Sequence, residues 1–179
     1  EGGMLAVLGS NIEIIEKILD DNKQEIKAQI ANDNSDSQIV LSGKIKDLEI
    51  LIKILKENSI KTIKLPVSAP FHCSLMSNAT IIMRKELNKL TFQNSGKKLI
   101  SNVTSEPISN FEELKNLLIK QVENRVRWRE SVINMIKNGI THFIEIGPGK
   151  VLSGLVKRIN RDVKIDTINN QEDIINLKL

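Results

Sequence analysis

A single histidine on a proline-rich stretch is the residue in this sequence best suited to acid–base chemistry. His72 follows Pro66 and Pro70 and comes directly before a predicted helix. A neutral imidazole in such a place can accept a proton from a serine hydroxyl and later return it. A base of this kind needs a hydrogen-bond acceptor on its other ring nitrogen, which holds it in one tautomer. The stretch therefore suggests a general base that serves a hydroxyl nucleophile.

Other readings of the reactive side chains have to be weighed against this one. Taken alone, an isolated histidine is more often a surface or packing residue. Cys73 adjoins His72, but neighbouring side chains rarely point at each other, so we expect Cys73 to be a small buried residue rather than half of a dyad. His142 opens a predicted strand with no candidate ligand or nucleophile nearby, which favours a structural role. The G-x-S-x-G pentapeptide of a serine nucleophile is absent from the sequence.

The glycines at positions 147 and 149 flank Pro148 in a turn between a predicted strand and a predicted helix. The turn resembles half of a phosphate loop, but the G-x-x-x-x-G-K-[ST] pattern is missing. We therefore expect the glycines to permit a tight turn that Pro148 stiffens. No G-x-G-x-x-G pattern indicates a dinucleotide site, and no His/Glu spacing indicates a metal site. No cofactor is predicted.

Composition excludes several classes of function. The net charge is +4, the lysines are scattered, and there are four Phe, one Trp and no Tyr, so no nucleic-acid surface is predicted. The single cysteine excludes an internal disulfide and a cysteine-based zinc cluster. No apolar run reaches the ~18 residues of a membrane span. We expect a cytoplasmic protein and, since the sequence does not begin with Met, a piece of a longer one.

The first 65 residues alternate strand and helix in the order βαββαβ, that of a ferredoxin-like unit. Ser10 and Glu13 have capping-box spacing and predict the start of the first helix. The polar run 32–37 predicts a turn. The predicted strands are 4–8, 26–30, 39–41 and 63–65, and the second helix spans 45–55.

Residues 66–179 alternate strands and helices in a way that favours a parallel α/β sheet with helical cover. Asn110 and Glu113 are spaced to cap one of the helices. The predicted domains are therefore 1–65, a ferredoxin-like subdomain, and 66–179, part of a larger α/β domain. The predicted helices of the second part lie at 76–90, 110–118, 128–136 and 151–159, and its strands at 99–103, 143–146 and 163–168.

Five stretches resemble, in the same order, those of bacterial malonyl-CoA:acyl-carrier-protein transacylases. Val67–Met76 resembles the family's histidine motif, and Asn32–Gly43 resembles its Asn-x-Asn-Ser segment. Asn102-Val103 resembles an Asn-Val strand end. Gln121–Trp128 resembles the Gln-x-x-x-Pro-Val-x-Trp segment, and Glu145–Leu152 the Glu-x-Gly-Pro-Gly-x-Val-Leu turn. The likeness spans nearly all of the chain.

This resemblance implies a ferredoxin-like subdomain inserted into an α/β-hydrolase-like domain, of which the chain would be the C-terminal portion. It implies that a serine takes malonyl from malonyl-CoA and passes it to the phosphopantetheine thiol of acyl carrier protein, in fatty acid biosynthesis. His72 would be the base, and Gln121 would orient it through its main-chain carbonyl. Asn32 and Asn34 would bind substrate.

The resemblance also implies that the serine nucleophile, the arginine that pairs with the malonyl carboxylate and a glutamine of the oxyanion site belong to a preceding N-terminal half. Arg125, Arg127 and Arg129 are not expected to replace that arginine. The sequence departs from the family pattern at Asp36 and Arg125, where prolines are usual.

Two non-enzymatic alternatives remain open. The chain alone could be an inactive fragment, or it could be a module that binds carrier protein without catalysis. An RNA-binding role for the ferredoxin-like unit is disfavoured, because its predicted strands at 26–30 and 39–41 carry none of the aromatic side chains on which bases stack.

Overall fold

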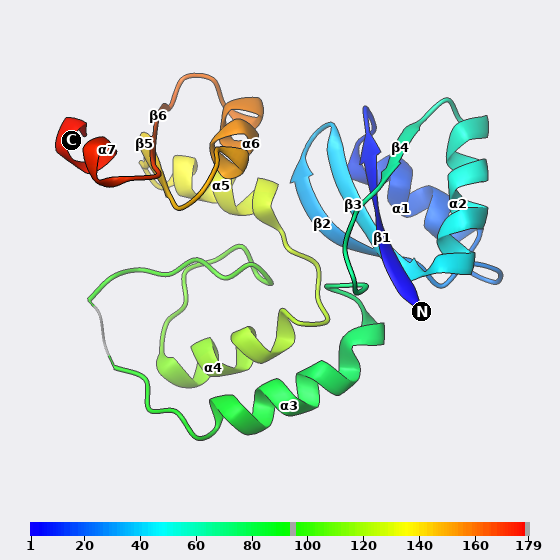
Figure 1. Ribbon diagram of the computed structural model, residues 1–179, viewed down its shortest axis with the longest axis horizontal. Coiled ribbons are helices and arrows are strands. Elements are labelled where there is room, and N and C mark those ends of the chain that lie inside the picture. Colours follow the sequence, from blue (N-terminus) through cyan, green and yellow to red (C-terminus); the bar gives the residue numbers. More distant parts are fainter. Residues whose placement is uncertain (94–95, 178–179) are drawn as a thin grey trace. The chain divides into compact units, whose positions relative to one another are not determined.

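The computed structural model describes residues 1–93 and 96–177 and divides into two compact units, Glu1–Ser131 and Val132–Leu179. The boundary predicted at residue 65 lies inside the first unit. Leu65 donates a hydrogen bond to the Met4 carbonyl at 3.0 Å, and Val126, much later in the chain, exchanges backbone hydrogen bonds with Ala31 and Asp33. Figure 1 shows the elements of both units.

The first unit contains an antiparallel sheet with strand order β2-β3-β1-β4. Strand β1 lies in the middle and pairs with β3 on one side and β4 on the other. This confirms the predicted βαββαβ order and its ferredoxin-like topology. The elements are β1 (Gly2–Leu8), α1 (Ile12–Asp21), β2 (Gln29–Ser35), β3 (Gln38–Lys44), α2 (Ile45–Glu57) and β4 (Lys61–Lys64).

Helices α1 and α2 both pack on one face of this sheet (Figure 1). The apolar spacing seen in the sequence places their buried residues against alternate strand residues, as expected for amphipathic elements. The opposite face carries a smaller cluster made by Met4, Ala31 and Val40, with Leu65 against it. The main core consists of Leu5, Val7, Ile12, Ile15, Ile26, Ile39, Leu41, Leu48, Leu51 and Leu55.

The polar run 32–37, predicted as a turn, is mostly strand. Strand β2 begins at Gln29 rather than at Ile26 and continues to Ser35, so only positions 36 and 37 form the turn. Asn, Asp and Ser favour turns locally, but a tertiary contact overrides that preference here. The buried carboxylate of Asp33 pairs with Arg129, which comes 96 positions later in the chain.

Two further sequence predictions are wrong. Helix α1 is capped by Asn11, whose side chain accepts a hydrogen bond from the Ile14 amide at 3.0 Å, and not by Ser10. Residues 99–103 form no strand; within the described residues they contribute one bridge, between Ile100 and Pro107. The hydroxyl of Ser101 accepts hydrogen bonds from two nearby amides and so closes a local turn in place of a ladder.

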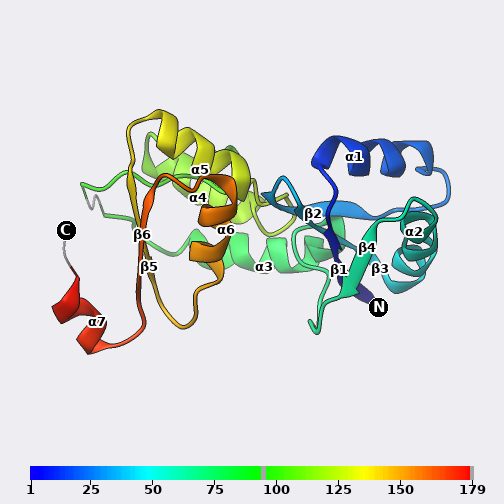
Figure 2. The same ribbon diagram turned by 90° about the horizontal axis from the view of Figure 1, so that it is seen from above.

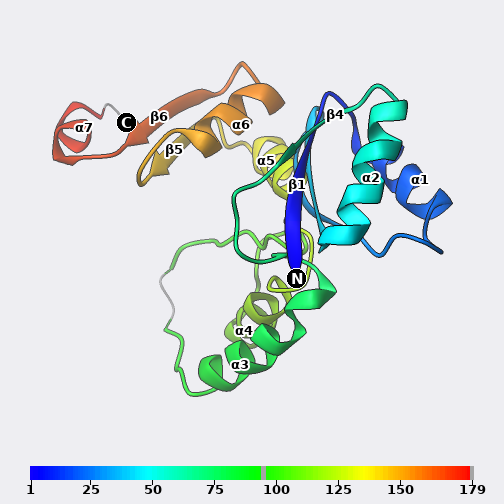
Figure 3. The ribbon, with the colours of Figure 1, turned by 45° about the vertical axis from the view of Figure 1, so that its right-hand side comes forward.

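The rest of the first unit consists of helices joined by loops. A short 3-10 helix, η1 (Ser74–Met76), leads into α3 (Ser77–Leu87), which lies beside α4 (Phe111–Lys120) (Figures 1 and 3). The cap predicted for α4 is confirmed, because the Asn110 side chain accepts a hydrogen bond from the Glu113 amide at 2.9 Å. Helix α5 (Trp128–Lys137) begins at the end of this unit.

The second unit is built on a parallel strand pair, as the alternation of strands and helices predicted. Strands β5 (His142–Ile146) and β6 (Lys164–Ile168) run side by side, connected through α6 (Val151–Ile159), and α7 (Gln171–Asn176) follows (Figure 2). The short α7 was not predicted. Among the described residues, no helix combines the length and the apolar character that a membrane crossing needs.

We expect the core of the first unit to depend on Leu51 much more than on its neighbour Ile50. Leu51 is fully buried, so Leu51→Ala should lower the free energy of unfolding by about 2–5 kcal/mol. Ile50 is 39% exposed, so the matched Ile50→Ala should cost less than about 1 kcal/mol. Urea unfolding followed by fluorescence of Trp128, the single tryptophan, measures both. Equal losses would contradict the assignment of the core.

Candidate active site

The loop that carries His72 is fixed to the sheet by the two residues after it. Cys73 is 1% exposed, and its sulfur accepts a hydrogen bond from the Ser42 hydroxyl of β3 at 3.5 Å. The Ser74 amide donates to the side-chain oxygen of Gln29 on β2 at 2.7 Å. The prediction that Cys73 is a small buried side chain is confirmed, and its burial anchors the loop.

His72 itself has a left-handed backbone, with φ of 59°. Few residues other than glycine adopt this conformation, and it persists only where the surroundings enforce it. The anchors at Cys73 and Ser74 supply that enforcement immediately after the histidine. The backbone therefore fixes the direction in which the His72 side chain leaves the loop.

The structure brings His72 together with Gln121, the residue that the resemblance implied. Nδ1 of the imidazole lies 2.7 Å from the main-chain carbonyl oxygen of Gln121. A carbonyl can only accept, so the neutral ring carries its proton on Nδ1, and Nε2 becomes the proton acceptor. Gln121 is the C-cap of α4, where the last carbonyls lack helical partners and carry a partial negative charge. That charge suits a ring that becomes an imidazolium.

A pocket of about 360 Å³ opens beside His72. Its walls come from α1, the start of β2 and the segment after Gln121, all within the first unit. The lining mixes charged, amide and aliphatic side chains, which suits a polar ligand better than an apolar one. The residues that line it with His72 are Glu16, Leu19, Gln29, Ile30, Glu123, Asn124 and Arg125.

Asn32 and Asn34 lie further along β2 and are partly buried. Neither is among the described residues that line the pocket beside His72. Asn32 forms an isolated parallel bridge with Val126, which ties this part of β2 to the segment after Gln121. A substrate-binding role for the two asparagines therefore stays a prediction from the resemblance.

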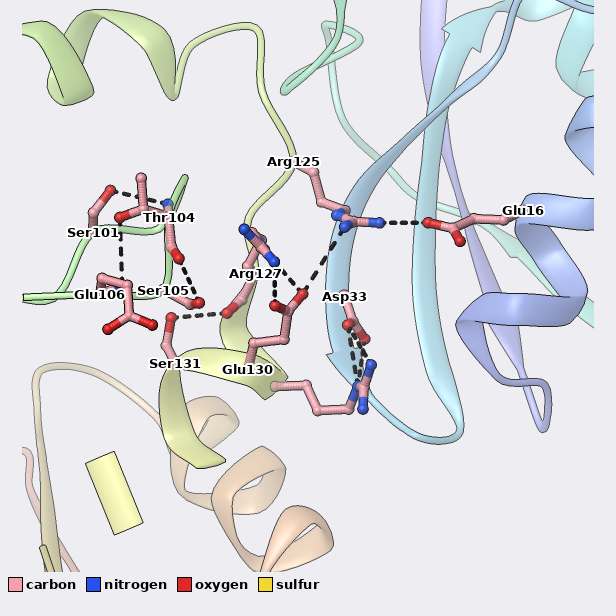
Figure 4. Close-up of polar contacts among 11 residues, drawn as sticks. Glu16, Asp33, Ser101, Thr104, Ser105, Glu106, Arg125, Arg127, Glu130 and Ser131 are labelled. Carbon is pink, nitrogen blue, oxygen red and sulfur yellow. Dashed lines mark hydrogen bonds and ion pairs between the residues drawn. The ribbon is translucent and has the colours of Figure 1, made fainter. Parts of the chain in front are cut away.

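The arginines at positions 125, 127 and 129 all pair with carboxylates of the first unit, and Figure 4 shows Arg125 and Arg127 with their partners. None of them offers an unpaired guanidinium to a substrate carboxylate. That they do not replace the substrate-binding arginine implied by the resemblance stays a prediction. Arg125 pairs with Glu16 at 2.9 Å and Glu130 at 3.9 Å, Arg127 with Glu130, and Arg129 with Asp33 at 3.0 Å and Asp36 at 3.3 Å.

Sequence reasoning missed the buried pair of Asp33 and Arg129. Hydrogen bonds to Asp33 raise the pKa of the Arg129 guanidinium above its ordinary value, although partial burial opposes the shift. No local pattern could have revealed a contact across 96 positions. The one available hint was a carboxylate inside the otherwise uncharged stretch at 32–35, between predicted core strands.

The glycine turn has the structural role predicted for it. Gly147 and Gly149 have φ of 138° and 91°, a region that disfavours other residues. The carboxylate of Glu145 accepts hydrogen bonds from the amides of Leu152 and Ser153 at 3.1 and 2.7 Å. A phosphate at the start of α6 would need these amides to be free. The carboxylate of Glu145 already binds them, so it takes the place that a phosphate would occupy.

His142 bonds to a carboxylate within the second unit. Its Nε2 lies 2.7 Å from an oxygen of Asp166 on the neighbouring strand β6. This contact joins β5 to β6, which agrees with the structural role predicted for His142. In residues 1–93 and 96–177, no group of three or more His, Cys, Asp or Glu side chains is arranged to hold a metal ion.

Comparison with known proteins gives one consistent set of relatives by sequence. No family model matches. The malonyl CoA-acyl carrier protein transacylase of Bacillus subtilis is 40% identical over 176 residues, which cover 97% of this chain and 56% of the relative. The protein of the same name from Synechocystis is 34% identical and is matched over 98% of this chain and 59% of its own length.

Comparison with solved structures finds relatives with the same kinds of name. An acyl-carrier-protein-S-malonyltransferase from Bartonella henselae matches with a TM-score of 0.93 and 40% identity, over 98% of this chain and 56% of that one. A malonyl-transacylase solved in complex with a type II PKS acyl-carrier protein matches with a TM-score of 0.91 and 30% identity, over 97% and 57%. The chain therefore spans little more than half the length of these relatives.

We expect the two histidines to be opposite neutral tautomers. His72 donates from Nδ1 to a carbonyl, whereas His142 donates from Nε2 to a carboxylate. Long-range ¹H–¹⁵N NMR spectra at alkaline pH, where ordinary histidines are neutral, distinguish the two forms. A variant with His142→Gln assigns the signals. A His72 ring that is mainly protonated on Nε2 would contradict the geometry of the site.

Proposed function

This chain belongs to the malonyl CoA-acyl carrier protein transacylase family, and we propose that it supplies the catalytic base of such an enzyme. The reaction is the transfer of a malonyl group from coenzyme A to the phosphopantetheine thiol of an acyl carrier protein. His72 is the general base and acid, and Gln121 orients it through its main-chain carbonyl. The serine nucleophile comes from a part of the enzyme that this chain does not contain.

The observation that carries the proposal is the 2.7 Å contact between His72 Nδ1 and the Gln121 carbonyl. A histidine base must hold a single tautomer in a fixed direction, and an acceptor behind the ring achieves both. The pocket beside the ring adds space for a reactant. A packing histidine needs neither feature.

In the first half-reaction, Nε2 of His72 takes the proton of the serine hydroxyl while the serine oxygen attacks the malonyl thioester carbonyl. The tetrahedral intermediate then collapses. The carbon–sulfur bond breaks, and the imidazolium returns its proton to the leaving thiolate of coenzyme A. The products are a malonyl-seryl ester and free coenzyme A, with the imidazole neutral again.

The second half-reaction reverses these roles. His72 takes the proton of the carrier protein's phosphopantetheine thiol, and the sulfur attacks the seryl ester. Collapse of the intermediate releases the serine oxygen, which recovers its proton from the imidazolium. The negative end of α4, at Gln121, favours the imidazolium in both halves.

Malonyl-CoA and acyl carrier protein are proposed as partners because the relatives carry these names and one relative was solved with a carrier protein. Asn32 and Asn34 are proposed to bind substrate on the likeness of their segment to the family. Their place on β2, the strand whose start lines the pocket beside His72, supports this.

We expect His72→Ala to lower malonyl transfer by about 10²- to 10⁴-fold in the complete enzyme, since the proton transfer loses its base. The measurement is the rate of malonyl transfer from malonyl-CoA to carrier protein. His142→Ala is the matched control, because His142 lies outside the proposed site and should leave the rate nearly unchanged. A near-normal rate for His72→Ala would reject His72 as the base.

We also expect the 179-residue chain alone to form no malonyl ester, because it has no G-x-S-x-G nucleophile segment. Intact-mass spectrometry after incubation with malonyl-CoA tests this, with the complete Bacillus subtilis relative treated alike as the comparison. A stoichiometric malonyl adduct on a serine of this chain would show that the nucleophile lies within it, and the division of labour proposed above would be wrong.

A further inference from the structure

A fully buried carboxylate sits in the middle of β2. Asp33 has no exposed surface. Both of its oxygens accept hydrogen bonds from Nε of Arg129 at 3.1 Å, and Nη2 of the same guanidinium lies 3.0 Å from one of them. A buried charge is strongly destabilising without its partner, so this pair fixes the position of Arg129 relative to β2.

The backbone next to this pair is fixed to the same strand. The Asp33 amide donates to the Val126 carbonyl at 2.9 Å, and the Val126 amide donates to the Ala31 carbonyl at 2.8 Å. Residues 126–129 are thus attached to β2 at two points, one through the main chain and one through the Arg129 side chain. Figure 4 shows Asp33 on its strand opposite the segment that carries Arg125 and Arg127.

This segment begins at the carbonyl that holds the imidazole. Val126 comes five positions after Gln121, so the chain between them can span at most about 18 Å. A cross-link reinforces the connection: the Arg127 amide donates to the Asn102 carbonyl at 2.8 Å, and the Asn102 side chain donates to that of Gln121 at 3.4 Å. The position of the Gln121 carbonyl therefore depends on where residues 126–129 are held.

The loop that carries the imidazole is attached to the same strand, β2. Ser74, two positions after His72, is bonded to Gln29 at the start of β2. Both partners of the bond between His72 and the Gln121 carbonyl are thus anchored on one strand. Any slip of residues 126–129 along β2 moves the carbonyl but leaves the ring in place.

We infer that Asp33 and Arg129 are positioning residues, which hold the segment after Gln121 in register with β2 so that its carbonyl meets Nδ1 of His72. The inference rests on the proposed function of His72. An arginine suits the task because its planar fork fixes distance and orientation together, whereas a lysine would supply a point charge on a flexible stem.

The other arginines of the segment cannot do the same. Arg127 pairs with Glu130, which lies three positions later in the first turn of α5, so this pair does not attach the segment to β2. Arg125 pairs with Glu16 of α1, whose side chain is 54% exposed, and such exposed pairs contribute little. Arg127→Gln is therefore the matched control: it removes an arginine–carboxylate pair of the same segment without touching the attachment to β2.

The test follows the tautomer of His72 by long-range ¹H–¹⁵N NMR in the 179-residue chain, with His142 as an internal reference. In Arg129→Gln we expect the ratio of Nδ1–H to Nε2–H forms of His72 to fall about three- to tenfold, as for loss of one ordinary hydrogen bond. Arg129→Lys should restore part of the ratio. Arg127→Gln should leave it unchanged, and no variant should alter His142.

A folded Arg129→Gln chain in which His72 keeps its tautomer ratio would overturn the inference. Should this variant not fold, the double variant Asp33→Asn, Arg129→Gln removes the uncompensated buried charge and is measured in its place. If the double variant keeps the ratio, or if neither folds, the pair serves stability and not positioning, and the inference is rejected.

This experiment separates the inference from the proposed function. The tautomer ratio reports the contact between His72 and the Gln121 carbonyl whether or not the chain takes part in acyl transfer. A shifted ratio in Arg129→Gln combined with a normal rate for His72→Ala in the complete enzyme would leave the positioning intact and remove the catalytic role. An unshifted ratio with a slow His72→Ala enzyme would do the reverse.

Discussion

The hydrogen bond from His72 to the Gln121 carbonyl is the interaction on which the rest of the site depends. Many histidine bases are oriented by a carboxylate, which must itself be desolvated and held. A carbonyl at the end of α4 is neutral, yet it presents the partial negative charge of the helix terminus to the ring. In the proposed mechanism, this carbonyl stabilises the imidazolium without a second buried charge beside the reacting atoms.

A main-chain carbonyl as the acceptor behind the ring imposes a strict geometric requirement. A main-chain carbonyl cannot swing to follow the ring as a side chain could, and an effective hydrogen bond allows only a few tenths of an ångström. Two loops far apart in the sequence must therefore be fixed against one frame. Strand β2 is that frame, through Gln29 for the histidine loop and through Asp33 for the segment after Gln121. Two polar side chains of this edge strand, Gln29 and Asp33, form these two attachments.

What the sequence could reveal depends on how local each signal was. The histidine loop, the cap at Asn110 and the βαββαβ order are encoded within short stretches, and they were predicted correctly. Residues 32–35 were misread as a turn because their polar side chains favour turns locally, while the partner of Asp33 in the strand, Arg129, lies 96 positions away. The turn at Ser101 was misread as strand for a related reason, since a hydroxyl hydrogen bond outweighed the apolar pattern around it.

The division of the fold bears on how such an enzyme can be assembled. The proposed base His72, the Gln121 carbonyl and both anchors lie within the first unit, Glu1–Ser131, so the entropy of arranging them is lost when that unit folds. In the proposed mechanism, the serine hydroxyl then has to meet Nε2 with the distance and direction of a hydrogen bond. Since Nδ1 is already bonded, the ring cannot rotate to meet a misplaced nucleophile. In the proposed reaction, the segment that carries the serine must therefore place its hydroxyl at a base that is already fixed.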